Sequence, residues 1–251
     1  MKIELFYHLY IPADSRGLRW HWILDAQMKL IIQSKLNEAA DLNICVSMPM
    51  WWETDEYGGG FFPENGGANI PFCAKVVNYI NARYPFARIL EVRDISQKNL
   101  YEGLTLDYLH EYCMSTDAYV LYTHSKGMTG TSTNVWNWRE ILDHYTITEW
   151  ASCVKHLANN DVVCVRDRQS KETGDIINSG NCWWARSDYV RSLPKPTDIQ
   201  SYADKKVVLK SERHAYELWI MKNSPRTHFM VDTGVNHYVD RCYIEDLINK
   251  K

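Results

Sequence analysis

Short apolar runs alternate with longer amphipathic stretches along the first two thirds of the chain. The runs have the length and the β-branched and aromatic content of buried strands, at residues 2–11, 43–48, 87–92, 118–122 and 161–165. The stretches between them carry apolar residues at helical spacing, at about residues 18–40, 70–83, 104–114 and 134–158. Strands that alternate with helices in this way predict an α/β fold, with a mostly parallel central sheet and helices on both faces.

The pattern becomes more polar after residue 165. Residues 166–175 are rich in charge and predict a loop. The remaining predicted elements are a strand after a tight turn, a helix capped by Ser187, a helix capped by Ser211, a last strand and a short terminal helix, at residues 178–186, 188–193, 211–223, 226–231 and the C-terminal tail.

No repeat, low-complexity tract or linker divides the sequence. We therefore expect one domain over residues 1–251, with a first half at 1–165 and a second half at 166–251.

Composition excludes several classes of function. The net charge is −3, whereas nucleic-acid binders present a basic surface, so we expect no nucleic-acid partner and only a local site for anions. Residues 1–11 carry Glu4 and His8 within the apolar run and read as a core strand rather than a signal, and no run is long enough to span a membrane. The seven cysteines lack C-x-x-C spacing, so we expect reduced thiols and a cytoplasmic protein without an integral membrane segment.

Residues 118–139 are the most informative stretch for function. They run from a strand through Thr123-His124-Ser125-Lys126-Gly127 into a helix, and this places polar residues where open α/β sheets bind ligands. Hydroxyl groups, a lysine and a glycine that lets backbone amides approach suit the phosphates of a nucleoside diphosphate. The alternative is a surface loop with a solvated lysine and histidine. The chain has no G-x-x-x-x-G-K-[ST] motif and no dinucleotide fingerprint, so ATP hydrolysis and hydride transfer are poorly supported.

Five segments together resemble a known family. They are FYHLYI, YVLYTHSKG, NVWNWRE, SGNCWWARSDYVRSLP and E-x-W, at residues 6–11, 119–127, 134–140, 179–194 and 217–219. In this order they resemble small GT-A glycosyltransferases, which are found among bacterial capsular and cell-wall polysaccharide enzymes and among large algal viruses that glycosylate their capsid proteins. The likeness runs from residue 3 to about residue 237 and is most specific at 124–127 and 179–185.

The resemblance implies a GT-A-like, Rossmann-like fold. It implies an enzyme that transfers a hexose or deoxyhexose from a nucleotide-diphosphate sugar to a glycan or glycoprotein, in polysaccharide biosynthesis or protein glycosylation. Residues 1–165 would bind the nucleotide sugar, and residues 166–251 would form the acceptor side and the C-terminal tail. The base and the sugar stay open, with UDP among the nucleotides to test.

The chain departs from the family in one respect, since many GT-A enzymes hold Mn²⁺ or Mg²⁺ through Asp-x-Asp and this sequence has none. A leaving diphosphate can be stabilised by a metal or by fixed cations and hydrogen-bond donors. We predict that Lys126, His124 and Arg139 hold the diphosphate, with the divalent ion auxiliary or absent. His124 and His237 are the candidate metal ligands, and a structural role is the alternative for His237.

The family places the nucleotide at the end of the first strand, which here carries Tyr7, His8 and Tyr10. Tyrosine and histidine can stack on a base, and tyrosine can hydrogen-bond a ribose. For at least one of the three, an ordinary core or surface position is the alternative.

An inverting transfer needs a carboxylate that takes the proton of the acceptor hydroxyl. Glu217, which precedes an aromatic residue in E-x-W, is the favoured base, and Glu212 and then Asp188 are the alternatives. The competing interpretation of Glu217 is an ion pair with Arg213 at i,i+4 spacing. A retaining mechanism would need no such base, and the sequence leaves the stereochemistry open.

Residues 179–184 are the expected acceptor side, with Ser179, Gly180 and Asn181 in a turn before Trp183 and Trp184. The turn can bind sugar hydroxyls, and an indole can cover the apolar face of a sugar ring. Because strand neighbours point oppositely, only one of the two tryptophans should face the site. A glycine-rich segment that contains Trp51, Trp52, Asp55 and Tyr57 is a second candidate surface.

Two rival functions fit part of the sequence. A non-catalytic carbohydrate-binding module would explain the ten tryptophans but not the alternation of strands and helices. A sugar nucleotidyltransferase shares the expected sheet, but it should carry a Gly- and Arg-rich loop after the first strand, which Asp14-Ser15-Arg16-Gly17 matches only faintly.

Overall fold

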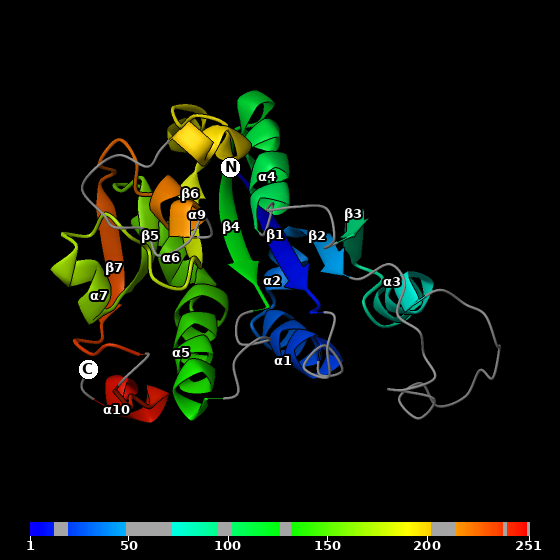
Figure 1. Cartoon of the computed structure of the whole chain (residues 1–251), viewed down its shortest axis with the longest axis horizontal. Coiled ribbons are helices and arrows are strands. Elements are labelled where there is room, and N and C mark those ends of the chain that lie inside the picture. Colours follow the sequence, from blue (N-terminus) through cyan, green and yellow to red (C-terminus); the bar gives the residue numbers. More distant parts are fainter. Residues whose placement is uncertain are drawn as a thin grey trace.

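The fold is built on one seven-stranded sheet (Figure 1). The computed structural model describes residues 1–12, 20–48, 72–94, 102–125, 132–201, 214–237 and 240–249. The strands are β1 Lys2–Tyr10, β2 Asp41–Met48, β3 Ala87–Asp94, β4 Ala118–His124, β5 Val162–Arg166, β6 Trp183–Arg186 and β7 Thr227–Asp232. Their order is β3-β2-β1-β4-β6-β5-β7, and within it β6 alone runs antiparallel to its neighbours. This arrangement confirms the predicted α/β fold with a mostly parallel sheet.

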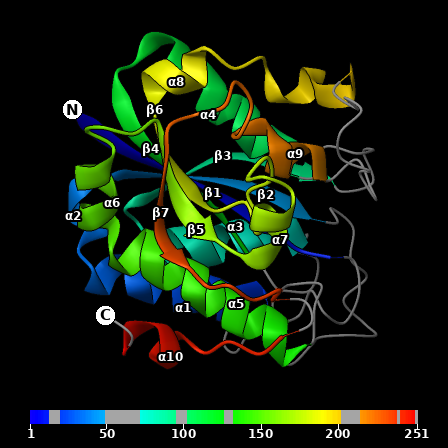
Figure 2. The same ribbon diagram turned by 90° about the vertical axis from the view of Figure 1, so that its left-hand side faces the viewer.

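Helices cover both faces of the sheet (Figure 2). One face packs against α4 Gly103–Ser115, α8 Ser187–Arg191 and α9 His214–Trp219. The other packs against α1 Trp20–Gln33, α3 Phe72–Arg83 and α6 Trp150–His156, and α5 Thr133–Asp143 lies on the same side with α10 Ile244–Ile248. Each face of the sheet has its own apolar core, and successive residues of β1 point into opposite cores. Phe6 packs with α4, whereas Leu5 and Tyr7 pack with α1.

Two predicted helices are interrupted. The helix expected over residues 18–40 divides into α1 and α2 Leu36–Ala39, because Lys35 adopts a left-handed conformation with φ of 60°. The helix expected over 134–158 contains a π turn, η2 His144–Thr148. Trp184 Nε1 donates to the carbonyl oxygen of Thr146 at 2.8 Å, so a side chain from the sheet bonds the backbone within this wide turn.

Part of the expected loop at 166–175 is helical. Asp167 Oδ1 accepts a hydrogen bond from Ser170 N at 2.8 Å and so caps α7 Arg168–Glu172. The expected strand at 178–186 is regular only from Trp183, because Gly180 and Asn181 have φ of 89° and 46° and form a turn before it. A 3₁₀ turn, η3 Pro196–Ser201, precedes α9.

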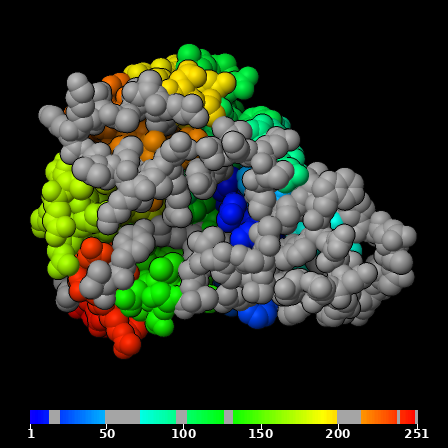
Figure 3. All heavy atoms as spheres, in the orientation of Figure 1, coloured from blue at the N-terminus to red at the C-terminus, as the bar shows by residue number. Residues whose placement is uncertain are grey.

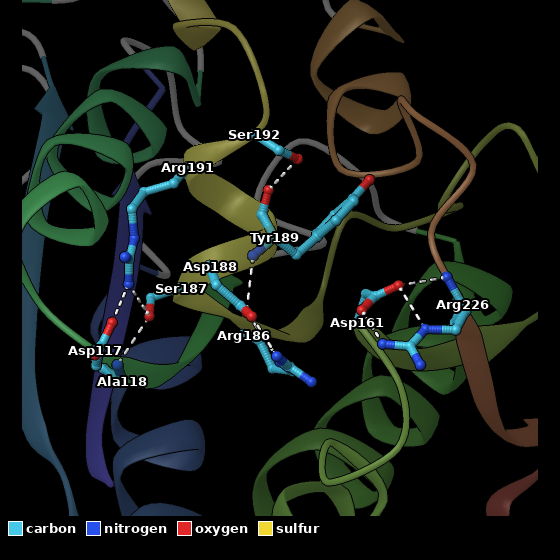
Figure 4. A network of polar contacts seen from close by, with 10 residues as sticks. All are labelled: Asp117, Ala118, Asp161, Arg186, Ser187, Asp188, Tyr189, Arg191, Ser192 and Arg226. Carbon is cyan, nitrogen blue, oxygen red and sulfur yellow. Dashed lines mark hydrogen bonds and ion pairs between the residues drawn. The ribbon is translucent and has the colours of Figure 1, made fainter.

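A polar network fixes the amino-terminal end of β4 (Figure 4). Ser187 Oγ accepts a hydrogen bond from Ala118 N at 2.9 Å, and Arg191 bonds both Ser187 and Asp117. Asp188 pairs with Arg186, whose hydrogen bond holds the pKa of that carboxyl below its usual range. Because Asp188 lies at the opposite end of β4 from His124 and is already paired, it is a poor candidate for the catalytic base.

All seven cysteines are free, and six of them are buried. No helix in the described part of the chain is long and apolar enough to cross a membrane.

Candidate active site

The strand order places a topological switch point between β1 and β4. From β1 the sheet extends outward to β2 and β3, and from β4 it extends the other way to β6, β5 and β7. In open α/β sheets, ligands bind outside the carboxyl ends of the strands at such a point. Atoms of β1 reach the surface in the middle of the face shown in Figure 3.

The ends of these two strands are directly joined. His8 lies opposite His124 in the register, and Ser125 N donates to the carbonyl oxygen of His8 at 3.0 Å. Tyr10 N donates to Ser125 Oγ at 2.9 Å. The structure therefore brings together the two segments that the sequence singled out for a donor, at the ends of the first and fourth strands.

Five buried residues form a polar group on the α4 face of this edge, here named the histidine cluster: His8, Glu102, Thr105, His124 and Asn181. His8 Nδ1 and Thr105 Oγ1 are hydrogen-bonded at 2.8 Å. His124 Nε2 donates to the carbonyl oxygen of Gly180 at 2.8 Å, and His124 Nδ1 is 3.7 Å from Glu102 Oε1. Asn181 Nδ2 donates to Glu102 Oε2 at 2.5 Å. The cluster thus ties β1, β4, the start of α4 and the 179–181 turn to one another.

Burial keeps His8 neutral. Burial, helped by the charge of His124 and opposed by that of Glu102, lowers the pKa of His8 to about 4. His8 Nε2 has no hydrogen-bond partner within the described residues. A neutral imidazole nitrogen in this position can donate or accept one further hydrogen bond, according to its tautomer.

Four buried residues form a second polar group on the α1 face, here named the Gln27 cluster: Tyr7, Gln27, Arg139 and Asp143. Gln27 Nε2 donates to Asp143 Oδ1 at 2.8 Å and to the carbonyl oxygen of His124 at 3.3 Å. Tyr7 Oη donates to Gln27 Oε1 at 2.5 Å. Gln27 therefore joins β1, β4 and α5 just behind the edge of the sheet.

Asp143 is the titratable centre of the Gln27 cluster. Burial raises the pKa of its carboxyl to about 7, although the hydrogen bond from Gln27 and the charge of Arg139 both oppose the rise. Arg139 is 6% exposed and lies over the ring of Trp136, with 4.8 Å between Cζ and the ring centroid. Its Nη1 has no hydrogen-bond partner among the residues that the structure describes.

The structure brings Glu217 to the same edge. Its backbone carbonyl accepts a hydrogen bond from Asn178 N at 3.0 Å, and its carboxyl-bearing side chain is buried. The preceding residue, Tyr216, packs over Gly103 so closely that a Cβ at residue 103 would lie 2.5 Å from Tyr216 Oη. α9 therefore adjoins both the start of α4 and the 178–181 turn.

Several predicted site residues lie elsewhere than expected. Trp183 and Trp184 are both fully buried, in the cores on opposite faces of the sheet, so neither presents an indole face to an acceptor. Tyr7 also points into the core, which matches the alternative kept for one of the three β1 residues. His237 stacks on Trp138 at 3.9 Å between ring centroids and bonds Thr233, so it packs against α5 and does not join the histidine cluster.

Two further predicted residues are buried, and the others lie outside the described ranges. Thr123 is buried beside Cys182, with 3.5 Å between Oγ1 and Sγ, and Ser179 is buried with no hydrogen-bond partner for Oγ in the described ranges. Lys126, Gly127, Glu212, Trp51, Trp52, Asp55 and Tyr57 lie outside the described residues.

Sequence reasoning missed Glu102, Gln27 and Asp143. Gln27 stands on the buried stripe of α1 with Leu24 and Met28, so a polar residue at an apolar helical position was the available signal. Asp143 is likewise a buried acid within α5. Glu102 gave no comparable signal, because an acid at the start of a helix is ordinary.

A cavity of about 540 Å³ lies at the other end of the strands, between α4 and the amino-terminal halves of β1, β2 and β3. Its buried carboxylate, Glu4, already accepts hydrogen bonds from Asn43 at 2.7 Å and Tyr112 at 3.0 Å, and it pairs with Lys2 at 2.6 Å. Because these polar groups satisfy one another, the carboxyl edge remains the better candidate for chemistry.

The fold and this edge together define an α/β protein with a candidate ligand site at the switch point of a mostly parallel sheet. The chain belongs to the family described as Domain of unknown function (DUF8361), whose model matches residues 80–244. No protein with a curated description matches the sequence. One solved structure that is similar is a candidate nucleotide-diphospho-sugar transferase from Desulfovibrio desulfuricans G20, with a TM-score of 0.44 and 12% identity over 92% of this chain and 81% of that one.

Proposed function

We propose that the chain is a glycosyltransferase that moves a hexose or deoxyhexose from a nucleotide-diphosphate sugar to a glycan or glycoprotein acceptor. The observation that carries the proposal is the meeting of β1 and β4 at the switch point, where Tyr10 and Ser125 are hydrogen-bonded. These strand ends belong to the segments that resemble GT-A enzymes, and nucleotides bind at this position in open α/β sheets.

The donor is proposed to lie across the ends of β1 and β4. Tyr10 is the partly exposed member of the three β1 candidates, so we assign it to the base and ribose. Lys126 and Gly127 directly follow Ser125 in sequence, and we assign them to the diphosphate together with Arg139. His124 is engaged with Gly180, so we assign it to the support of the acceptor-side turn rather than to the phosphates.

A divalent ion would stabilise the negative charge that develops on the leaving diphosphate. The described residues contain no group of three or more His, Cys, Asp or Glu side chains that could hold such an ion. Charge stabilisation is assigned mainly to Lys126 and Arg139, with a divalent ion auxiliary or absent.

Glu217 is proposed as the base that takes the proton of the acceptor hydroxyl. It is a buried acid beside the 178–181 turn, and a carboxylate within reach of the acceptor hydroxyl can act as a general base. Glu102 is the second acid at this edge, but Asn181 already bonds its carboxylate, so a positioning role suits it better.

Calorimetric titration with UDP, GDP, dTDP and CDP, each with Mn²⁺ and with a chelator, tests the proposal. We expect selective binding of one nucleotide, with binding retained in chelator. Binding of glycans without any nucleotide would favour a carbohydrate-binding module. Release of pyrophosphate from a nucleoside triphosphate and a sugar 1-phosphate would favour a nucleotidyltransferase.

Glu217→Gln tests the assigned base. The substitution removes the proton acceptor but keeps the shape of the side chain, so donor affinity should be unchanged while turnover falls by about 10²- to 10⁴-fold. Glu38→Gln, at an exposed position on α2, serves as the control and should match the wild type in both measurements. Wild-type turnover by Glu217→Gln would move the role to Glu102 or Glu212.

A further inference from the structure

Arg139 is a buried cation with an incomplete set of partners. A guanidinium carries five N–H donors, and it is seldom buried without a partner for each. Here the side chain is 6% exposed, Nη1 has no hydrogen-bond partner among the described residues, and Nε is 3.9 Å from Asp143 Oδ2. That distance is too long for a hydrogen bond. Such an arrangement would be completed by an anion that accepts from the free N–H groups.

Asp143 is held by Gln27 more closely than by Arg139. Gln27 Nε2 is 2.8 Å from Asp143 Oδ1, and the same side chain is fixed by Tyr7 Oη and by the carbonyl oxygen of His124. An amide can donate to a carboxylate or to the carbonyl oxygen of a neutral acid. The position of Asp143 is therefore compatible with both of its protonation states.

Among the described residues, few charges surround Asp143. Arg139 and Glu140 face it from its own helix, while α1 presents the uncharged Gln27. β1 presents Tyr7, whose pKa burial raises well above its usual value, and β4 presents only the backbone carbonyl of His124. Tyr7 therefore stays neutral, and Arg139 and Asp143 are the charges that must balance in this buried group.

We propose that Asp143 is a positioning residue that takes up a proton when the diphosphate of the donor binds Arg139. The proposal rests on the proposed function. Before binding, the cation of Arg139 faces the carboxylate of Asp143. After binding, a phosphate oxygen accepts hydrogen bonds from Arg139, and the carboxylate takes a proton from solvent to become a neutral acid, while no covalent bond of the donor changes.

Electrostatics explains why the proton must move. Two anions beside one buried cation repel each other, whereas one anion, one cation and a neutral acid keep the buried group without net charge. The pKa of Asp143, which burial already raises to about 7, makes this proton uptake easy near neutral pH. Trp136, on which Arg139 stacks, is partly exposed and marks the side from which the phosphate can approach.

The test uses nucleotide sugars, because the terminal phosphate of a free nucleotide titrates near pH 6 itself, roughly where the measurement is made. UDP-glucose, GDP-mannose and dTDP-glucose are titrated calorimetrically into the wild-type protein at pH 6 and pH 8, in two buffers with different ionisation enthalpies. For a group with a pKa of about 7, affinity should fall about tenfold from pH 6 to pH 8, with uptake of nearly one proton per ligand at pH 8.

Substitutions distinguish the role of Asp143 from that of Arg139. Asp143→Asn mimics the neutral acid, so its affinity should be the same at both pH values and no proton should be taken up. Glu38→Gln removes one negative charge from an exposed position on α2 and should keep the wild-type pH dependence. Arg139→Met should lose at least tenfold in affinity at both pH values.

The outcomes are distinguishable. Binding by the wild type without proton uptake, or proton uptake that persists in Asp143→Asn, overturns this inference alone. No binding of any nucleotide sugar at either pH overturns the proposed function and this inference with it. The number of protons that the wild-type protein takes up per bound ligand tests the inference even if Asp143→Asn does not fold.

Discussion

His8 and Asp143 lie on opposite faces of the sheet, and burial favours the neutral form of both. The pKa of His8 falls to about 4 and that of Asp143 rises to about 7. Each residue is bonded to an uncharged partner, Thr105 for His8 and Gln27 for Asp143. Strongly shifted titratable groups beside a ligand edge are more frequent at functional sites than elsewhere. At this scale, the candidate site is defined by two buried side chains whose neutral forms are favoured, and we expect Asp143 to become fully neutral only when a ligand binds.

Asp143 should make stability depend on pH. Its folded pKa of about 7 lies above the ordinary value of 3.8, so its contribution to stability is full below pH 3.8 and is lost as the pH rises through 7. Asp143→Asn removes this dependence. The variant should be more stable than the wild type at pH 8, and its advantage should shrink by about 2–3 kcal/mol at pH 5.

Urea unfolding at the two pH values measures this difference. Glu38→Gln, at an exposed position on α2, should follow the wild type at both. An advantage of Asp143→Asn that grows towards low pH would contradict the assigned pKa.

Short elements bring the second half of the chain to the edge of the sheet. α9 has six residues, and the 178–181 turn is held by left-handed conformations at Gly180 and Asn181. Asn178 of the turn is hydrogen-bonded to Glu217 of α9. Asn181 of the turn is hydrogen-bonded to Glu102 at the start of α4. The two short elements, α9 and the turn, are therefore fixed by contact with each other and with the longer helix α4.

Gly103→Ala tests the contact between α4 and α9. A Cβ at this position would lie 2.5 Å from Oη and 2.7 Å from Cζ of Tyr216, so the buried ring or the helix that carries it must shift. Alanine favours a helix over glycine, yet overpacking should destabilise the fold by about 1–3 kcal/mol. Turnover should also fall, because Glu102 and Glu217 adjoin the two contacting residues.

A double-mutant cycle supplies the control for this contact. Tyr216→Ala removes the ring, and in that background Gly103→Ala should cost nothing or stabilise the helix. Equal destabilisation in both backgrounds would show that the ring is not the cause.

At the scale of the whole molecule, the two halves of the sequence share one sheet. β6, from the second half, lies between β4 and β5, both from the first half. β7 then pairs with β5 at the edge. We expect residues 1–165 and residues 166–251 to bind different ligands. Because both halves contribute strands to one sheet, they form a single folded unit.

A fragment of residues 1–165 should not fold as it does in the full chain. Without β6, the strands β4 and β5 lose their shared partner, and Trp183 and Trp184 leave both cores. We expect the fragment to lack cooperative thermal unfolding by circular dichroism and to be digested rapidly under limited proteolysis. Cooperative unfolding of the fragment would show instead that the first half is an independent unit.

Sequence pattern alone determined the alternating elements and hence the mostly parallel sheet, because apolar periodicity reports directly on which positions are buried. It also placed Thr123, His124 and Ser125 at the end of a strand. It was wrong about the loop at 166–175, part of which is a helix that the local contact between Asp167 and Ser170 caps. It was also wrong about an exposed indole at Trp183 or Trp184, since burial on both faces of the sheet is set by neighbours distant in sequence.

Only the tertiary structure could decide which polar residues meet. Gln27 and Asp143 are 116 residues apart and Asn181 and Glu102 are 79 apart, so no local pattern couples either pair. Their contacts follow from strand order, which pairs β1 with β4 and inserts β6 beside it. The sequence determined which side chains could be buried, and the packing of helices on both faces of the sheet decided which buried polar groups became partners.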